Sequence, residues 1–257
     1  RSHRGIGWAV MELHIGTAGW QVTAAQRDAF PTEGTHLHRY AARLGAAEIN
    51  SSFYRPHATA TYARWRAQTP PGFRFAVKLP RAITHQARLR EAGEALHTFL
   101  DHVAGLSDRL GCLLVQLPPS LRFDAVVADG FLRALRRRHA GDVALEPRHA
   151  SWFDEQADAL LVQHHMARVL ADPQLHPRGA APGGWPGLVY LRLHGTPRVY
   201  TSAYEPGWLH RLAERIVQAR RETAALWCIF DNTAEGHALR DAMALQQAVD
   251  ARQEMTS

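Results

Sequence analysis

Lysine is almost absent from this 257-residue sequence: lysine and arginine together number 30, yet Lys78 is the only lysine. A chain that uses arginine wherever a generic cation suffices retains lysine where arginine cannot replace it. Burial lowers the pKa of a lysine amine, which then acts as base or nucleophile, whereas a guanidinium stays protonated. Asparagine is nearly as rare, with only Asn50 and Asn232, and all three residues lie at the ends of predicted strands. These scarce polar residues are the first indication of a site.

Cysteine and long hydrophobic runs are scarce as well. Cys112 and Cys228 each lie within an apolar run, which implies no disulfide framework and is typical of reduced core residues. Apolar stretches reach about ten residues, whereas a membrane-spanning helix needs roughly 20. Without a signal peptide either, we expect a cytoplasmic protein with no membrane partner. Residues 1–10, which precede Met11, fit no later pattern, and we interpret them as a tag or an upstream extension.

Short apolar runs alternate with helical stretches along the rest of the chain, residues 11–257, which we expect to form a single domain. The predicted strands are 14–17, 47–51, 73–79, 111–117, 143–146, 168–171, 188–194 and 225–230. Eight strand-then-helix units predict an α/β fold, a closed parallel (β/α)₈ TIM-like barrel. An open doubly wound sheet is disfavoured because no Gly-x-Gly-x-x-Gly turn follows the first strand, and we expect no nucleotide cofactor. The Pro/Gly-rich connector at 173–187 is a long loop and a candidate lid.

Ordered motifs over residues 15–244 also resemble a known family. They include Ile15-Gly16-Thr17-Ala18-Gly19-Trp20, Glu48-Ile49-Asn50-Ser51-Ser52-Phe53-Tyr54, Phe75-Ala76-Val77-Lys78, Leu114-Val115-Gln116-Leu117-Pro118-Pro119, Glu146-Pro147-Arg148-His149 and Tyr190-Leu191-Arg192-Leu193-His194-Gly195. In these the chain is similar to the YecE-like family, also called domain of unknown function 72. The resemblance implies a TIM-like barrel and no settled reaction. The chain departs from the family at Asp231, where relatives more often have asparagine.

Polar residues stand where the predicted strands end. In a barrel of this kind the active site lies at the C-terminal ends of the strands. The residues at or just beyond these ends are Trp20, Glu48, Asn50, Lys78, Gln116, Glu146, Arg148, His149, Asp172, Arg192, His194, Asp231 and Asn232. Nearby loops add Tyr54, His85 and Trp152 as candidate substrate-binding residues. Alternation places Glu48 with Asn50, and Arg192 with His194, on one side of their strands, but the pattern does not say which side faces the barrel axis.

The first functional hypothesis is metal-assisted hydrolysis of an anionic substrate such as a phosphoester. Carboxylate and imidazole groups suit a divalent metal, and Glu146, Asp172, His194 and Asp231 are the candidate ligands. Arg148, Arg192 and Lys78 are then expected to bind the anion. No His-x-x-x-His or His-Glu-x-x-His motif is present, so every ligand has to come from a different strand. We place this hypothesis slightly ahead of the second.

The second hypothesis is metal-free lyase or isomerase chemistry on a phosphorylated or carboxylated sugar. Lys78 is the nucleophile or base, and Glu146 or Glu48 its acid–base partner. His194 completes the predicted catalytic set. The third hypothesis is a nucleic-acid-binding protein with little catalysis, supported by a net charge of +6 and a pI near 9.9.

Each candidate also has a purely structural interpretation. Glu146 and Arg192 are expected to form an internal ion pair if neither binds substrate. Asn232 suits a turn or a helix cap, and the aromatic residues suit loop packing. We expect an enzyme, with its reaction open.

Overall fold

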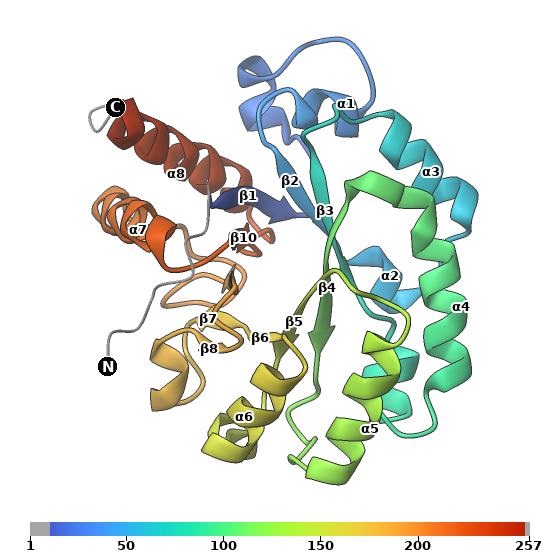
Figure 1. Cartoon of the computed structure of the whole chain (residues 1–257). Helices are drawn as coiled ribbons and strands as arrows, with labels where there is room; N and C mark the ends of the chain where they lie inside the picture. Colours follow the sequence, from blue (N-terminus) through green and yellow to red (C-terminus); the bar gives the residue numbers. More distant parts are fainter. Residues whose placement is uncertain (1–10, 255–257) are drawn as a thin grey trace.

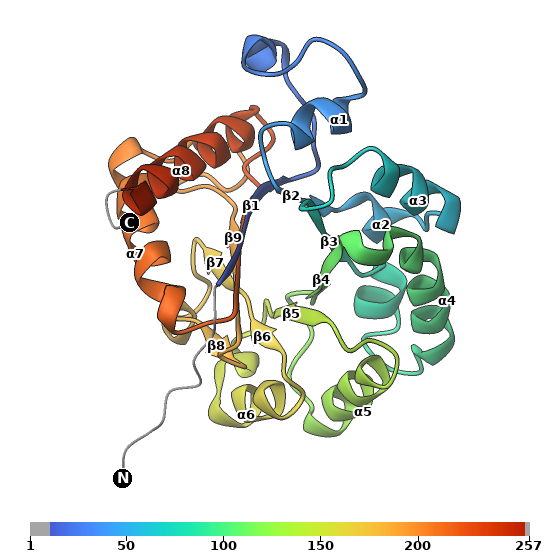
Figure 2. The same cartoon turned by 45° about the horizontal axis from the view of Figure 1, so that its top comes forward.

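The computed structural model describes residues 11–254, so the predicted tag or extension at residues 1–10 lies outside the described part. Ten strands form one sheet in the order β7-β9-β10-β1-β2-β3-β4-β5-β6-β8. Figure 2 shows the strands as a ring with the helices outside it. The strands are β1 (Glu12–Ala18), β2 (Ala46–Ile49), β3 (Arg74–Lys78), β4 (Leu110–Gln116), β5 (Asp142–Glu146), β6 (Ala167–Arg168), β7 (Leu170–Asp172), β8 (Gly183–Gly184), β9 (Leu188–Leu193) and β10 (Ala225–Phe230).

The helices mostly follow the strands along the chain, from α1 in blue to α8 in red (Figure 1). They are α1 (His36–Ala41), α2 (Ser51–Tyr54), α3 (Thr59–Ala67), α4 (Gly93–Val103), α5 (Ala125–Arg136), α6 (Glu155–Gln163), α7 (Pro206–Gln218) and α8 (His237–Glu254). Side chains set several starts: Thr35, Asp124 and Asp154 accept hydrogen bonds from the first-turn amides of α1, α5 and α6. None of the helices within residues 11–254 combines the length and hydropathy needed to cross a bilayer.

The predicted number of strands, eight in a closed parallel barrel, is wrong. The fold is a nearly closed α/β barrel of ten mostly parallel strands, because the predicted sixth strand, 168–171, is two pieces that change partner at Val169. Its first piece, β6, pairs with β5, and its second piece, β7, pairs with β9. The extra strand β8, in the connector after β7, pairs with β6 in the antiparallel direction. The other seven predicted strands match β1 to β5, β9 and β10.

Alternate residues of the strands pack inside the ring. The interior cluster holds small residues such as Ala46, Ala76 and Ala144 beside the large rings of Tyr190 and Trp227. The intervening residues face the helices and form the larger outer core. Because residues two apart share a face of a strand, each polar residue two positions beyond an interior residue points to the interior as well. The six residues placed in this way are Glu48, Lys78, Gln116, Glu146, Arg192 and Asp231.

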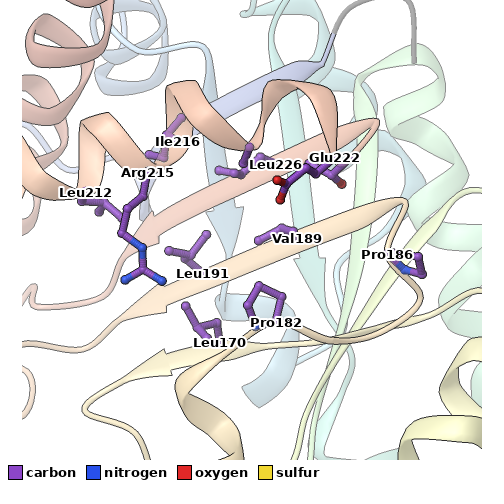
Figure 3. A pocket seen from close by; sticks show the side chains of 12 residues that line it. Leu170, Pro182, Pro186, Val189, Leu191, Leu212, Arg215, Ile216, Glu222 and Leu226 are labelled. Atoms are coloured by element: carbon purple, nitrogen blue, oxygen red, sulfur yellow. The ribbon is translucent and has the colours of Figure 1, made fainter. Parts of the chain in front are cut away.

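The connection between β7 and β9 contains no α-helix. Between β7 and β9 the chain forms only a short 3₁₀ turn, Pro177–Ala180, and β8. The outward side chains of Leu170, Val189 and Leu191 therefore line a cavity of about 250 Å³ between these strands and α7 (Figure 3). The connector that the sequence predicted as a long loop runs along this cavity, where Pro182 lines its wall.

Candidate functional site

Arg192 is the centre of a buried ion-pair network at the C-terminal ends of the strands. Its Nε and Nη2 donate to both oxygens of Glu48, at 3.0 and 2.6 Å, and its Nη1 donates to Glu146 Oε2 at 2.9 Å. Asp231 Oδ2 lies 3.1 Å from Nη2. Burial by itself lowers the pKa of Arg192, but the carboxylates, Glu48 first, raise it above its usual range. Buried charges persist only when they are paired in this way.

His194 bridges two of these carboxylates. Its Nε2 lies 3.0 Å from Glu146 Oε1 and its Nδ1 lies 3.0 Å from Asp231 Oδ2. A carboxylate only accepts, so both contacts are hydrogen bonds when the imidazole carries a proton on each nitrogen. Burial acts to lower the pKa of His194, but the hydrogen bonds to Asp231 and Glu146 raise it. The two carboxylates therefore favour the protonated imidazole, which bridges Glu146 and Asp231.

Glu146 is the most heavily engaged carboxylate. Besides Arg192 and His194, it accepts from Gln116 Nε2 at 3.0 Å and from Arg148 Nη2 at 3.1 Å. Burial by itself raises the pKa of Glu146, but Arg192 and His194 hold it well below its usual range. Glu146 therefore stays ionised at neutral pH and does not supply a proton there. The ion pair with Arg192 that the sequence offered as a structural alternative is present.

Lys78 stands next to this network but outside its hydrogen bonds. The side chain is only 7% exposed, and its ammonium makes no hydrogen bond with any residue in the described range 11–254. The Nζ atom lies 4.1 Å from the centroid of the Phe53 ring. Burial and then Arg192 lower the pKa of Lys78 to about 8, against the opposing effect of the carboxylates. Lys78 is therefore partly neutral near physiological pH.

His85 and Arg148 lie near the lysine, and His85 Nδ1 is 2.8 Å from the Thr84 hydroxyl oxygen. The His85 ring meets Phe53 edge-on at 4.9 Å, and burial, then the charges of Lys78, Arg81 and Arg148, lower its pKa. The Nε atom of Arg148 is buried without a partner among the described residues. A buried polar atom without a partner needs an explanation such as a bound ligand or water. Arg148 Nε therefore keeps an unused hydrogen-bond donor in this part of the site.

Several predicted site residues lie elsewhere or are engaged locally. Trp20 packs edge-on against Trp65, and Trp152 is buried with its indole N–H donating to Leu121 O. His149 caps a short turn by accepting from the Ser151 amide.

The remaining predicted substrate-binding residues are Asn50, Tyr54 and Asn232, and each has a different environment. Asn50 keeps a buried side-chain oxygen without a partner in the described part of the chain, and Tyr54 is 73% exposed beside Phe53. Asn232 donates to Ser202 O and to Asp241, so it anchors the loop after β9.

The four predicted metal ligands do not form one donor set. Asp172 accepts from the hydroxyls of Tyr204 and Thr196, apart from the network. Glu146, His194 and Asp231 are in contact, but their contacts are with each other and with cations. Within residues 11–254, no group of three or more His, Cys, Asp or Glu side chains is arranged to hold a metal ion. The four donors therefore do not fit a metal site.

Sequence reasoning missed two tyrosines. Tyr190 donates to Glu48 Oε2 at 2.8 Å from inside the barrel. Tyr200, on the loop after β9, meets the His194 ring edge-on at 5.6 Å and has φ +68°, a left-handed backbone that is rare for an aromatic residue. Alternation from Arg192 marks Tyr190 as an interior residue, whereas no local signal marks Tyr200.

The comparisons with known proteins agree with the family resemblance. A family model described as "Protein of unknown function DUF72" matches residues 14–257. The chain belongs to this family. A stretch of 84 residues is 37% identical to the UPF0759 protein YecE of Escherichia coli K12, and it covers 33% of this chain and only 31% of that relative's length.

Solved structures of other DUF72 proteins share the fold. A DUF72 protein from Enterococcus faecalis V583 aligns with a TM-score of 0.76 and 21% identity, over 93% of this chain and 95% of that chain. One from Thermotoga maritima MSB8 aligns with a TM-score of 0.75 and 24% identity, over 93% of this chain and 99% of that chain. At these identities the likeness concerns the fold alone.

Proposed function

We propose that this DUF72 protein is an enzyme in which the Lys78 amine reacts with the carbonyl group of a small anionic substrate. The observation that carries the proposal is the state of Lys78: the only lysine in the chain, buried, without a hydrogen bond in the described residues, and with its pKa lowered to about 8. Burial next to a guanidinium is a recognised way to produce a nucleophilic lysine. The reaction class is a lyase or isomerase acting on a phosphorylated or carboxylated sugar, in the cytoplasm.

The covalent step needs a neutral amine and a proton carrier. The Lys78 nitrogen attacks the carbonyl carbon, and the carbonyl oxygen then leaves as water while a carbon–nitrogen double bond forms. His85 is the candidate proton carrier, because burial and neighbouring cations lower its pKa and keep the imidazole neutral. The pKa of Glu146 is held well below its usual range, so Glu146 has a positioning role in this proposal and not an acid–base role. The unpaired Nε of Arg148 supports binding of the substrate's anionic group.

Reductive trapping tests this proposal with little background, because the chain has one lysine. We expect borohydride, added together with phosphorylated and carboxylated aldehydes and ketones, to attach at least one of them irreversibly to the peptide that contains Lys78. Intact mass and peptide mapping measure the adduct. The Lys78→Arg variant keeps only the N-terminal amine and provides the matched control. Equal labelling of the wild type and Lys78→Arg would contradict the proposal.

Metal-assisted hydrolysis, placed first from the sequence, has no specific observation in its favour. We expect protein purified without chelator or affinity metal to contain far less than one divalent ion per chain, and Glu146→Gln to show the same low content. The reason is that Arg192, Arg148, Gln116 and His194 already occupy the Glu146 oxygens. Elemental analysis measures this. Near-stoichiometric metal that Glu146→Gln loses would restore the hydrolase hypothesis.

A further inference from the structure

The segment after β3 has an unusual concentration of left-handed backbone. Three non-glycine residues, Arg88, Leu89 and Glu91, have φ values of +52°, +67° and +47°. Such conformations persist only where the surrounding structure holds them, and they gather at functional positions. Here Leu89 is 5% exposed and its amide donates to Ile83 O at 3.0 Å, which fixes the turn. Arg88 and Arg90 are thereby held on either side of a buried leucine.

These two arginines meet the loop between β4 and α5 across a cavity of about 340 Å³. This volume lies within the range of small-molecule sites. Arg122 of the β4–α5 loop also lines the cavity, so three guanidinium groups border it. Trp152, which the sequence offered as a substrate-binding residue, lines the same cavity. None of the network residues described above is among the lining residues.

The three guanidinium groups are far from neutralised. Arg88 donates to the hydroxyl and carbonyl oxygens of Ser120, at 3.0 and 2.8 Å, and both acceptors are uncharged. Arg122 makes no hydrogen bond or ion pair with any residue from 11 to 254. Arg90 has one contact, 3.4 Å to Asp124 Oδ2. The other oxygen of Asp124 accepts from the first amides of α5. Three positive charges thus face one carboxylate.

We propose that this arginine pocket, bordered by Arg88, Arg90 and Arg122, is a second anion-binding site that takes the phosphoryl group of a small phosphorylated molecule. A guanidinium presents N–H donors in a planar fork that matches phosphate oxygens, and Arg88 and Arg122 retain free donors for that purpose. The pocket is built from the loops after β3 and β4, and it binds its ligand whether or not Lys78 is reactive. The inference is therefore independent of the proposed enzymatic function.

Isothermal titration calorimetry with inorganic phosphate at constant ionic strength tests the proposal. We expect saturable binding to the wild type, at least ten-fold weaker binding to Arg122→Ala and Arg88→Ala, and unchanged binding to Lys78→Arg. Arg122→Ala is the decisive variant, because Arg122 has no contact in the described residues whose loss would disturb the fold. Arg137→Ala removes an exposed arginine at the other end of α5 and is the matched control.

A comparison of two ligands, ribose 5-phosphate and inorganic phosphate, shows whether the pocket binds a phosphate monoester or the free anion. Tighter binding of ribose 5-phosphate than of phosphate, lost in Arg122→Ala, identifies a phosphate monoester as the ligand, and equal binding identifies the free anion. Three results would overturn the site: no saturable binding to the wild type, wild-type affinity in Arg122→Ala, or loss of binding in Lys78→Arg. The last would place the anion at the barrel mouth instead.

Discussion

Replacing Arg192 with methionine is expected to lower the free energy of unfolding by about 3–5 kcal/mol, because it leaves buried carboxylates without their counter-charge. Glu48, Glu146 and Asp231 all contact this guanidinium, and Glu48 and Glu146 are 0% and 1% exposed. At about 2–4 °C per kcal/mol for a chain of this size, the melting temperature should fall by roughly 10 °C. Urea unfolding and thermal melts measure the two quantities.

The control for this loss is Arg64→Met, which removes an exposed arginine from α3. It should change the free energy of unfolding by less than about 0.5 kcal/mol. Adding Glu48→Gln to Arg192→Met removes one uncompensated charge and should recover part of the stability. A change below about 1 kcal/mol in Arg192→Met would show that the network is not the stabilising pair system described above.

The stability lost in Arg192→Met should depend on pH. The folded-state pKa values of Glu146 and Asp231 lie below their usual values because Arg192 and His194 outweigh the effect of burial. Their stabilisation is therefore present above the unfolded pKa values, near 4, and is lost as pH falls through the lower folded values. We expect the stability difference between the wild type and Arg192→Met to be full at neutral pH and to shrink below about pH 4.

Imine formation at Lys78 is expected to rise with pH around a midpoint near 8, about two units below the pKa of an ordinary lysine near 10.4. The neutral amine is the nucleophile, so the reactive fraction grows as pH rises through the lowered pKa. Pyridoxal 5′-phosphate serves as an anionic aldehyde probe, and absorbance followed by borohydride reduction measures the adduct. Peptide mapping separates Lys78 from the N-terminal amine, whose ordinary pKa is also near 8.

Lys78→Arg should lose the Lys78 adduct completely while its free energy of unfolding changes by no more than about 1 kcal/mol, because the ammonium makes no hydrogen bond in the described residues. This split between reactivity and stability is the signature of a functional residue rather than a structural one. A midpoint near pH 10 would show an ordinary, solvated lysine. A collapse of stability in Lys78→Arg, with Lys78 unreactive in the wild type, would assign the residue to packing.

The network and the lysine have different tasks in this proposal. Arg192 and His194 hold Glu146 and Asp231 ionised and fixed, so these carboxylates provide a rigid electrostatic environment rather than mobile protons. Lys78 and His85 are the groups whose pKa values are lowered toward or below neutrality. Pairs of titratable groups with differently shifted pKa values are a common mark of acid–base sites.

Composition and periodicity predicted the barrel architecture and most of the strands that carry the network. The apolar runs that became β4 and β10 are unambiguous because both faces of such strands are buried, inside the ring and under the helices. The singularity of Lys78 and the polar residues at strand ends predicted Glu48, Glu146, Arg192 and His194 as one group. Nothing in the sequence predicted the break at Val169, since the four-residue stretch 168–171 has the same pattern whether it has one pairing partner or two.

Only the tertiary structure decided what each polar residue does. Alternation fixes which residues share a side of a strand, but the interior side follows from packing, where Ala46 and Ala76 face the rings of Tyr190 and Trp227. Trp152 and Asn232 look like ligand contacts in sequence and are engaged by Leu121 and Ser202 in space. A pKa depends on burial and on neighbours that come from distant strands. The sequence by itself therefore determined that polar residues such as Glu146 and Arg192 end the strands. The fold decided which of them meet at the barrel mouth, and it leaves the Lys78 ammonium without a hydrogen-bond partner among residues 11–254.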